Sequence, residues 1–213
     1  MSIKIGIYDF FAYTIPGGIY LVSVIYLGYI FQSFNLDFAT VDLVPLLIFV
    51  ALSYVVGLIL NPISRMWYRF FKPENISQIT FEKFQDNNFS FKFNFETKDI
   101  PILVSYIKQN DMDVASEMGQ FNAMHIMLRN VSLSLVFLAI IQVLFLISKF
   151  SYWGLIVAVI FFGFSILAVK QSAKYEKWYY SNIYETLLAH NLTVSDLITR
   201  SQSIDSGKSK NLD

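Results

Sequence analysis

Four stretches of the chain are uncharged and almost wholly apolar, and each is close in length to what a helix needs to cross a bilayer. They run from about Phe10 to Phe31, Leu43 to Leu60, Val131 to Ser148 and Trp153 to Val169. A helix rises about 1.5 Å per residue, so about 20 apolar residues cross a hydrocarbon core of about 30 Å. Soluble proteins rarely contain helices that are apolar on every face over this length. The pattern therefore predicts an all-α membrane protein with four transmembrane helices, for which membrane lipid is the solvent.

Three of these helices are predicted to extend beyond the lipid. The second continues over residues 65–71, after which Pro73 ends it. The third begins at about Val114, because side chains of one face recur at steps of three and four from Val114 to Leu128. The fourth continues to about His190, since no Gly or Pro interrupts it. We expect the extensions of the third and fourth helices to form a stalk in the cytoplasm.

The segment between the second and third helices is predicted to be a small α+β cytoplasmic insertion. Residues 89–96 alternate strictly between aromatic and polar side chains, which is typical of a strand with one buried face. Residues 80–84 fit either a second strand or a short helix, and residues 101–109 are predicted to be helical.

The chain therefore divides into four parts. Residues 1–71 hold the first transmembrane pair with its interfacial ends, and residues 72–112 hold the insertion. Residues 113–190 hold the second transmembrane pair with its cytoplasmic helical extensions. The tail, residues 191–213, is predicted to be disordered, because its final part is rich in Ser, Lys, Asp and Gly.

The distribution of Lys and Arg predicts the orientation. The loop after the first helix, residues 32–42, carries two aspartates and no basic residue. The turn between the third and fourth helices carries only Lys149. The basic clusters that flank the helices fall beside the insertion and the C-terminal arm: Arg65, Arg69, Lys72, Lys108, Arg129, Lys170, Lys174 and Lys177. Because basic loops stay in the cytoplasm, both termini are expected there. Richness in Phe, Tyr, Ile, Asn and Lys is typical of AT-rich prokaryotic genomes, so the membrane would be the cell inner membrane.

The amino-acid composition limits the kinds of binding site and reactive site that the chain could contain. The chain is 55% hydrophobic and 15% charged, against about a quarter charged in typical globular proteins. The net charge is zero, so no direct nucleic-acid binding is expected. The chain has no cysteine, which excludes disulfides and thiolate sites.

The four apolar stretches contain no Asp, Glu, His or Lys. Enzymes and proton-coupled carriers of the membrane usually place such side chains within their transmembrane helices. The two histidines, His125 and His190, lie far apart in the sequence. The acidic residues Asp111, Asp113 and Glu117 lack the glycine and the final glutamate of a calcium loop. We therefore predict no enzymatic activity, no metal and no cofactor.

Association between helices is the chemistry that the apolar stretches do offer. Ser53, Gly57 and Asn61 recur at four-residue steps and share one helix face, and small or polar residues allow helices to pack closely in lipid. Together with Ser134 and Gln142, these are the candidates for helix packing or for lining a pore. The simpler interpretation is a packing seam within one chain; the alternatives are a seam between subunits and a pore wall.

Two further groups of residues are candidates for function. Pro16, Gly17 and Gly18 predict a kink in the first helix, which either fits the packing or serves as a gating hinge. The candidates for a cytoplasmic interaction surface are basic or aromatic: Arg65, Arg69, Phe91, Phe93, Arg129 and Trp178.

Three short patches, Tyr8–Gly17, Gly57–Ser64 and Met127–Leu133, resemble a broad group of uncharacterised small prokaryotic membrane proteins, some of which are associated with phage-defence systems. The resemblance covers a small part of the chain and includes no chemical signature. It implies an anti-phage membrane effector, in which a cytosolic partner senses infection and the membrane protein assembles into a pore or disrupts the bilayer.

Two functions follow as hypotheses. The first is a homo-oligomeric pore-forming or membrane-permeabilising effector controlled from the cytoplasm. Such oligomers usually have closed cyclic symmetry, and a tetramer is the guess among them. A hydrophobic constriction can gate a pore, so the uncharged spans do not exclude conduction. The alternative is a non-conducting scaffold or sensor that recruits a cytosolic protein partner through the insertion.

Overall fold

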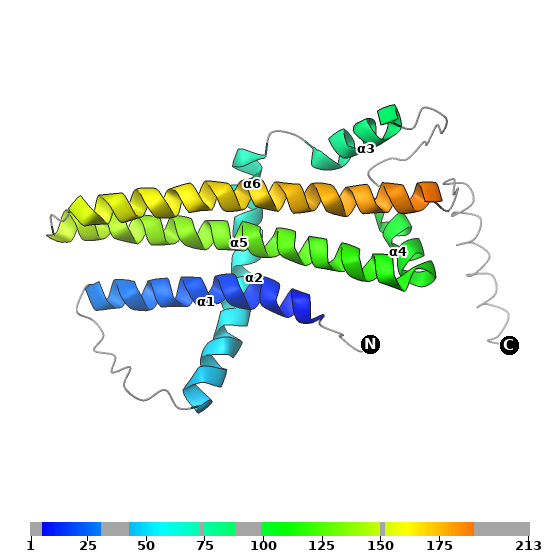
Figure 1. The fold of residues 1–213 in the computed structure, drawn as a ribbon. Helices are drawn as coiled ribbons and strands as arrows, with labels where there is room; N and C mark the ends of the chain where they lie inside the picture. The colour runs from blue at the N-terminus through cyan, green and yellow to red at the C-terminus, as the bar shows by residue number, and fades with distance from the viewer. Residues whose placement is uncertain (1–5, 31–42, 73–74, 88–98, 150–151, 190–213) are drawn as a thin grey trace. The chain divides into compact units, whose positions relative to one another are not determined.

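The computed structural model describes residues 6–30, 43–72, 75–87, 99–149 and 152–189, and these residues form helices and no strand (Figure 1). The helices are α1 (Ile7–Ile30), α2 (Leu43–Phe71), α3 (Ile76–Asn87), α4 (Ile100–Asn110), α5 (Met112–Lys149) and α6 (Tyr152–Ala189). Four of them, α1, α2, α5 and α6, are long and apolar enough to cross a membrane. The prediction of a multi-pass, all-helical membrane protein is confirmed.

The predicted helical extensions are also present. Helix α2 continues through Pro62 to Phe71, and α5 and α6 each run for 38 residues without a break. At the start of α5, Asp111 Oδ1 accepts a hydrogen bond from the Val114 backbone N–H, 3.1 Å away. This contact satisfies one of the donors that a helix start leaves unpaired.

The α+β class predicted for the insertion is not supported. Its described residues form α3 and α4, so residues 80–84, which fitted a strand or a helix, are helical. Ser77, Thr80, Phe81 and Phe84 recur at helical steps, and both phenylalanine rings pack on Tyr184. Residues spaced three to four positions apart thus form one face of α3, and this face packs on Tyr184. The predicted strand at residues 89–96 lies outside the described residues.

The chain folds as two compact units. The first unit comprises Met1–Pro73 and Asn122–Tyr175, and the second comprises Glu74–Phe121 and Glu176–Asp213. Helices α5 and α6 therefore each contribute residues to both units.

In the first unit, α5 lies between two helices. Ser134 on α5 donates a hydrogen bond to the Pro16 carbonyl of α1, and the rings of Tyr20 and Phe137 stack with centroids 4.5 Å apart. Ser132 and Ser165 join α5 to α6, which runs antiparallel to it. Helix α2 crosses α1 (Figure 1), and Tyr54 of α2 stacks on Phe10 of α1 with ring centroids 5.5 Å apart. Small residues at this crossing allow the backbones of α1 and α2 to approach closely.

The first unit has a polar interior and an apolar exterior. Only 17–33% of the residues in each membrane-length window are buried inside the protein, so most of the apolar side chains point outward. The buried polar side chains of this unit are Ser23, Ser53, Ser64, His125, Arg129, Asn130, Ser132, Ser134, Gln142, Ser165 and Ser172. In water this distribution would be unfavourable, whereas in lipid polar groups bond between helices. The arrangement fits lipid as the solvent.

The second unit has an apolar core of its own. Its buried side chains are Leu103, Ile107, Met118, Ile183, Tyr184 and Leu187. They come from α4, from the first turns of α5 and from the last turns of α6, and α3 adds its phenylalanines. The Tyr184 hydroxyl lies 3.3 Å from Ser77 Oγ, which ties α3 to α6.

Tyr184→Phe is expected to destabilise the second unit by about 1 kcal/mol, because it removes the two long buried hydrogen bonds to Ser77 Oγ and to the Ser77 carbonyl and changes little volume. Hydrogen exchange of the full chain in lipid nanodiscs should show faster exchange in α3 and in the last turns of α6. Tyr152→Phe, which changes a side chain that is almost fully exposed, is the matched control and should leave exchange unchanged. Equal exchange in both variants would contradict the role of these hydrogen bonds.

Candidate functional site

A buried arginine lies at the centre of the polar interior of the first unit. Arg129 of α5 is 4% exposed, and it hydrogen-bonds with side chains of α2 and of α5 itself, while Ser172 of α6 bonds its neighbour His125. We call this set the Arg129 cluster: Asn61 and Ser64 of α2, His125, Arg129 and Asn130 of α5, and Ser172 of α6. A charge kept inside a membrane-type unit is costly, and such residues are usually functional.

The guanidinium group of Arg129 holds α2 against α5. Its Nη2 donates to Asn61 Oδ1, and its Nε donates to Ser64 Oγ, 3.3 Å away. Its Nη1 lies 3.4 Å from His125 Nε2, one turn earlier on α5. Hydrogen bonds that involve a charged group contribute more than neutral ones, about 1.5–3 kcal/mol each. The contacts of Arg129 with α2 are therefore the strongest polar link that we identify between those helices.

His125 connects the cluster to α6, and its partners fix its tautomer. Arginine can only donate, so His125 Nε2 accepts from Arg129 and the ring proton lies on Nδ1. Nδ1 is 3.1 Å from the Ser172 carbonyl oxygen and 2.9 Å from Ser172 Oγ. The Ser172 hydroxyl in turn donates to the His125 carbonyl. With its proton on Nδ1, His125 donates to Ser172, so this Ser–His pair joins α5 to α6.

One polar atom of the cluster is unsatisfied. Asn130 is fully buried, its Oδ1 is hydrogen-bonded with Ser64 Oγ, and its Nδ2 has no hydrogen-bond partner among the described residues. A buried donor without a partner costs about 1–3 kcal/mol.

A second set of serines continues the polar contacts away from the Arg129 cluster. The indole Nε1–H of Trp67 donates to Ser132 Oγ at 3.0 Å. Ser165 donates to the Ser132 carbonyl, so the Ser132 hydroxyl donates to Ser165 Oγ, 2.8 Å away. These contacts add links from α5 to α2 and to α6.

The crossing of α1 and α2 leaves no room for side chains. A Cβ atom added to Gly17 would lie 1.8 Å from the Ser53 carbonyl oxygen, and one added to Gly57 would lie 2.0 Å from the Tyr13 carbonyl oxygen. Gly18 differs, since its Cβ would lie 3.4 Å from Ser53 Oγ, an ordinary contact. Gly17 and Gly57 therefore permit direct backbone contact between the two helices.

The row of small residues predicted on α2 faces two different helices of the same chain. Ser53 and Gly57 meet α1, whereas Asn61, one turn further on, binds Arg129 of α5. Pro16 lies inside α1 and is buried, and its carbonyl accepts a hydrogen bond from Ser134. These placements correspond to packing within one chain.

The other predicted candidates lie apart from one another. Gln142 is buried. Its backbone carbonyl oxygen would lie 2.9 Å from a Cβ atom added to Gly154 of α6, so α5 and α6 pack tightly there. Arg65 and Arg69 are exposed on α2. In the second unit, Trp178 is 37% exposed and its ring packs on Phe121. Phe91 and Phe93 lie outside the described residues.

Arg129 was predicted on a cytoplasmic surface, and the structure places it in the interior. Sequence reasoning also missed Ser64, Asn130 and Ser172 as its neighbours. The available signal was His125, four residues before Arg129 on the stripe that begins at Val114. A histidine and an arginine one turn apart on a mostly apolar face indicate a shared buried environment.

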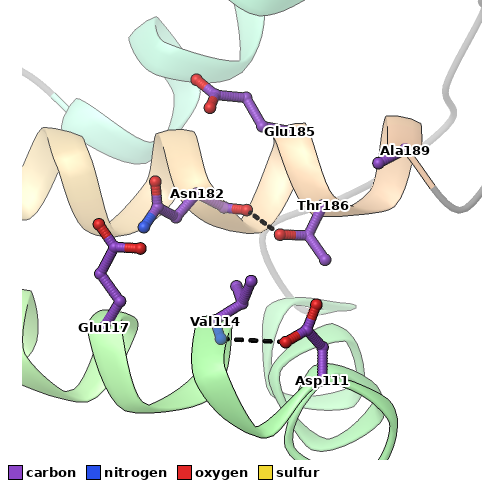
Figure 2. Close-up of a pocket in the computed structure, with 7 residues that line it drawn as sticks. All are labelled: Asp111, Val114, Glu117, Asn182, Glu185, Thr186 and Ala189. Atoms are coloured by element: carbon purple, nitrogen blue, oxygen red, sulfur yellow. Dashed lines mark hydrogen bonds between the residues drawn. The ribbon is translucent and has the colours of Figure 1, made fainter.

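The second unit contains an open acidic cleft of about 320 Å³ between the first turns of α5 and the last turns of α6 (Figure 2). Asp111, Val114, Glu117, Asn182, Glu185, Thr186 and Ala189 line it. Local contacts occupy two of the carboxylates, since Asp111 caps α5 and Glu185 accepts a hydrogen bond from Ser181. Among the described residues, no group of three or more His, Cys, Asp or Glu side chains is placed to hold a metal ion.

The Arg129 cluster is thus the part of the described structure with the most unusual chemistry. Its geometry provides a charged link among α2, α5 and α6 inside an apolar surface. No protein-family model, curated protein or solved structure matches the chain.

Proposed function

We propose that this chain is a multi-pass inner-membrane protein that assembles into a homo-oligomeric pore or otherwise permeabilises the bilayer, and that its cytoplasmic helices control this activity. The Arg129 cluster is the observation that carries the proposal. In the resting state Arg129 binds Asn61 and Ser64 inside the first unit. In the active state these contacts break and water reaches the arginine.

The energetics of the cluster favour two discrete states. A central arginine that loses its partners in hydrocarbon costs about 2.5–3.5 kcal/mol or more, so partial separation of α2 from α5 is unfavourable. A water-filled path hydrates the charge and also satisfies the Asn130 amide. The unsatisfied Nδ2 atom therefore raises the free energy of the resting state and brings the two states closer.

Control through the second unit is proposed because α5 and α6 contribute to both units. His125 lies three residues inside the first unit on α5, and Ser172 lies three residues inside it on α6. A rotation or shift of the outer turns of either helix passes along an unbroken helix to this His125–Ser172 contact. A cytosolic partner that binds the second unit would act in this way.

The orientation and the defence role belong to the same proposal. The basic residues at the end of α2 and in α6 support cytoplasmic termini by the positive-inside rule. A C-terminal green fluorescent protein fusion should fluoresce and a C-terminal alkaline phosphatase fusion should stay inactive; the reverse pattern would contradict this orientation. A role in phage defence rests on the three short patches of sequence resemblance.

The direct test is reconstitution of the purified full chain in liposomes that contain a self-quenched dye. Asn61→Leu removes the acceptor from Arg129 and should raise dye release at least tenfold over the wild type. Asn61→Leu combined with Arg129→Met removes both partners and should restore tight vesicles, because a matched apolar pair leaves no buried charge. Light scattering of the detergent-solubilised chain should give a closed oligomer, with a tetramer expected.

Gly163→Ala is the matched control, since a Cβ there would meet nothing within 4 Å. It should release no more dye than the wild type. A monomeric chain that leaves vesicles tight in every variant would overturn the pore proposal.

The separately cored second unit favours one alternative, a non-conducting scaffold or sensor that recruits a cytosolic protein. Its exposed Trp178, beside Phe121, would form part of the docking surface. Trp178→Ala should then abolish capture of the partner while dye release stays at the background level. Dye release from the Asn61→Leu variant would favour the pore.

A further inference from the structure

The last turns of α2 display cations and large apolar side chains on the outside of the first unit. Arg65 and Arg69 are exposed. Beside them, Met66 is 64% exposed and Phe70 is 82% exposed. We call these four residues the basic–aromatic end of α2.

The helix period separates this surface from the face that packs on the protein. At about 100° per residue, Arg65 and Arg69 lie about 40° apart, and Met66 and Phe70 form an adjacent ridge. Ser64 belongs to the opposite side and is buried. The two cations and the apolar ridge therefore point away from the rest of the first unit together.

Neither water nor hydrocarbon suits this combination. Large exposed apolar side chains favour burial, and arginine is costly in the hydrocarbon core. Phospholipid headgroups provide both environments, because phosphates lie beside the upper acyl carbons. The basic–aromatic end of α2 thus matches the layer between lipid and water.

The position of the surface along α2 agrees with this layer. The helix is uncharged from Leu43 to Leu60. Arg65 follows Leu60 by about 7.5 Å along the axis and Arg69 by about 13.5 Å. The headgroup layer of one leaflet is about 5–8 Å thick, and long arginine side chains reach back toward it. Both guanidinium groups can therefore reach lipid phosphates.

We propose that the basic–aromatic end of α2 is a binding site for anionic phospholipids, such as phosphatidylglycerol. Arg65 and Arg69 bind the lipid phosphate through paired N–H donors, and Met66 and Phe70 contact the upper acyl chain. Anionic lipids are preferred because, in a zwitterionic lipid, the positive charge of the choline compensates the negative charge of the phosphate and weakens its attraction to arginine. This site is separate from the Arg129 cluster and does not depend on pore formation.

Trp67 provides a local probe for the test. Its side chain is half-buried on the same turns of α2, and the chain has only three tryptophans. With Trp153 and Trp178 replaced by Phe, the fluorescence of the full chain reports on Trp67. Quenching is then compared between bilayers that contain brominated phosphatidylglycerol and bilayers that contain brominated phosphatidylcholine.

A preference for phosphatidylglycerol of about 25-fold is expected, since each arginine near an anionic lipid contributes about fivefold. Arg65→Gln with Arg69→Gln should bring the preference close to one. The charge-matched control, Lys83→Gln with Lys108→Gln, changes two exposed lysines of the second unit and should keep it. Arg65→Lys with Arg69→Lys should retain part of it.

Three results would overturn the proposal. Equal quenching by the two lipids in the wild-type background would show that no anionic site exists. An equal loss in the lysine control would show a general charge effect. Displacement of the brominated lipid by inorganic phosphate at equal ionic strength would assign the site to free anions.

Discussion

Gly17→Ala and Gly57→Ala are each expected to destabilise the first unit by about 3 kcal/mol or more. The added Cβ would fall about 2 Å from a carbonyl oxygen of the crossing helix, and no side-chain rotation can relieve a clash with backbone. Overpacking of tight interiors typically costs about 1–3 kcal/mol, and a backbone clash lies at the upper end. The free energy of unfolding of the full chain, measured by titrating mixed micelles with sodium dodecyl sulfate, provides the test.

Gly18→Ala is the matched control, because it adds the same methyl group one residue along α1. Its Cβ would lie 3.4 Å from Ser53 Oγ, so we expect a change within about 0.5 kcal/mol, with the higher helix propensity of alanine offsetting the contact. If Gly17→Ala and Gly18→Ala had the same stability, α1 and α2 would not make the backbone contact described above.

Asn61→Leu is expected to destabilise the first unit by about 1.5–3 kcal/mol, the range for a hydrogen bond that involves a charged group. Leucine has the same branching and the same number of side-chain heavy atoms as asparagine but offers no acceptor, so Arg129 Nη2 loses its hydrogen bond to residue 61. Arg129→Met should cost less, because the remaining amide is neutral. Unfolding in mixed micelles again measures both changes.

The double variant decides whether the two residues interact directly. Asn61→Leu with Arg129→Met should be more stable than Asn61→Leu alone, with a coupling energy of at least about 1.5 kcal/mol. Additive effects of the two substitutions would contradict the hydrogen bond between them. Gln142→Leu, at a buried polar side chain outside the cluster, should show additive behaviour with Arg129→Met.

The membrane helices could be predicted because lipid leaves a strong signal in sequence. Where solvent is apolar, a helix needs no polar face, so α1, α2, α5 and α6 read as long uncharged runs. The continuation of α5 and α6 was likewise visible, as neither run contains a helix-breaking proline. These features depend only on residues close together in the sequence.

The partners across the interior could not be predicted in this way. An arginine beside an apolar stretch is what the positive-inside rule expects at a membrane surface, so Arg129 was assigned to the outside. Its burial depends on Asn61, 68 residues away, and no periodicity links the two. Similarly, Gly57 signals close packing, but only the fold identifies the Tyr13 carbonyl as its neighbour.

The insertion was ambiguous for a related reason. Residues 80–84 contain Phe81 and Phe84 three positions apart, which favours a helix, but also Thr and Phe, which favour a strand. The choice depends on Tyr184, about 100 residues later, on which both rings pack. Tertiary contact therefore decides a local conformation that propensity leaves open.

The sequence separation of these contacts also constrains the order in which the first unit assembles. Helices α5 and α6 are joined by a short connection and can pair through Ser132 and Ser165, 33 residues apart, soon after they enter the membrane. The Arg129–Asn61 and Asn130–Ser64 contacts join segments 68 and 66 residues apart and require the preceding helices to dock on that hairpin. Long-range contacts of this kind close late. Asn61 is therefore synthesised well before Arg129, and assembly of the first unit ends when the late arginine finds acceptors on a helix that is already inserted.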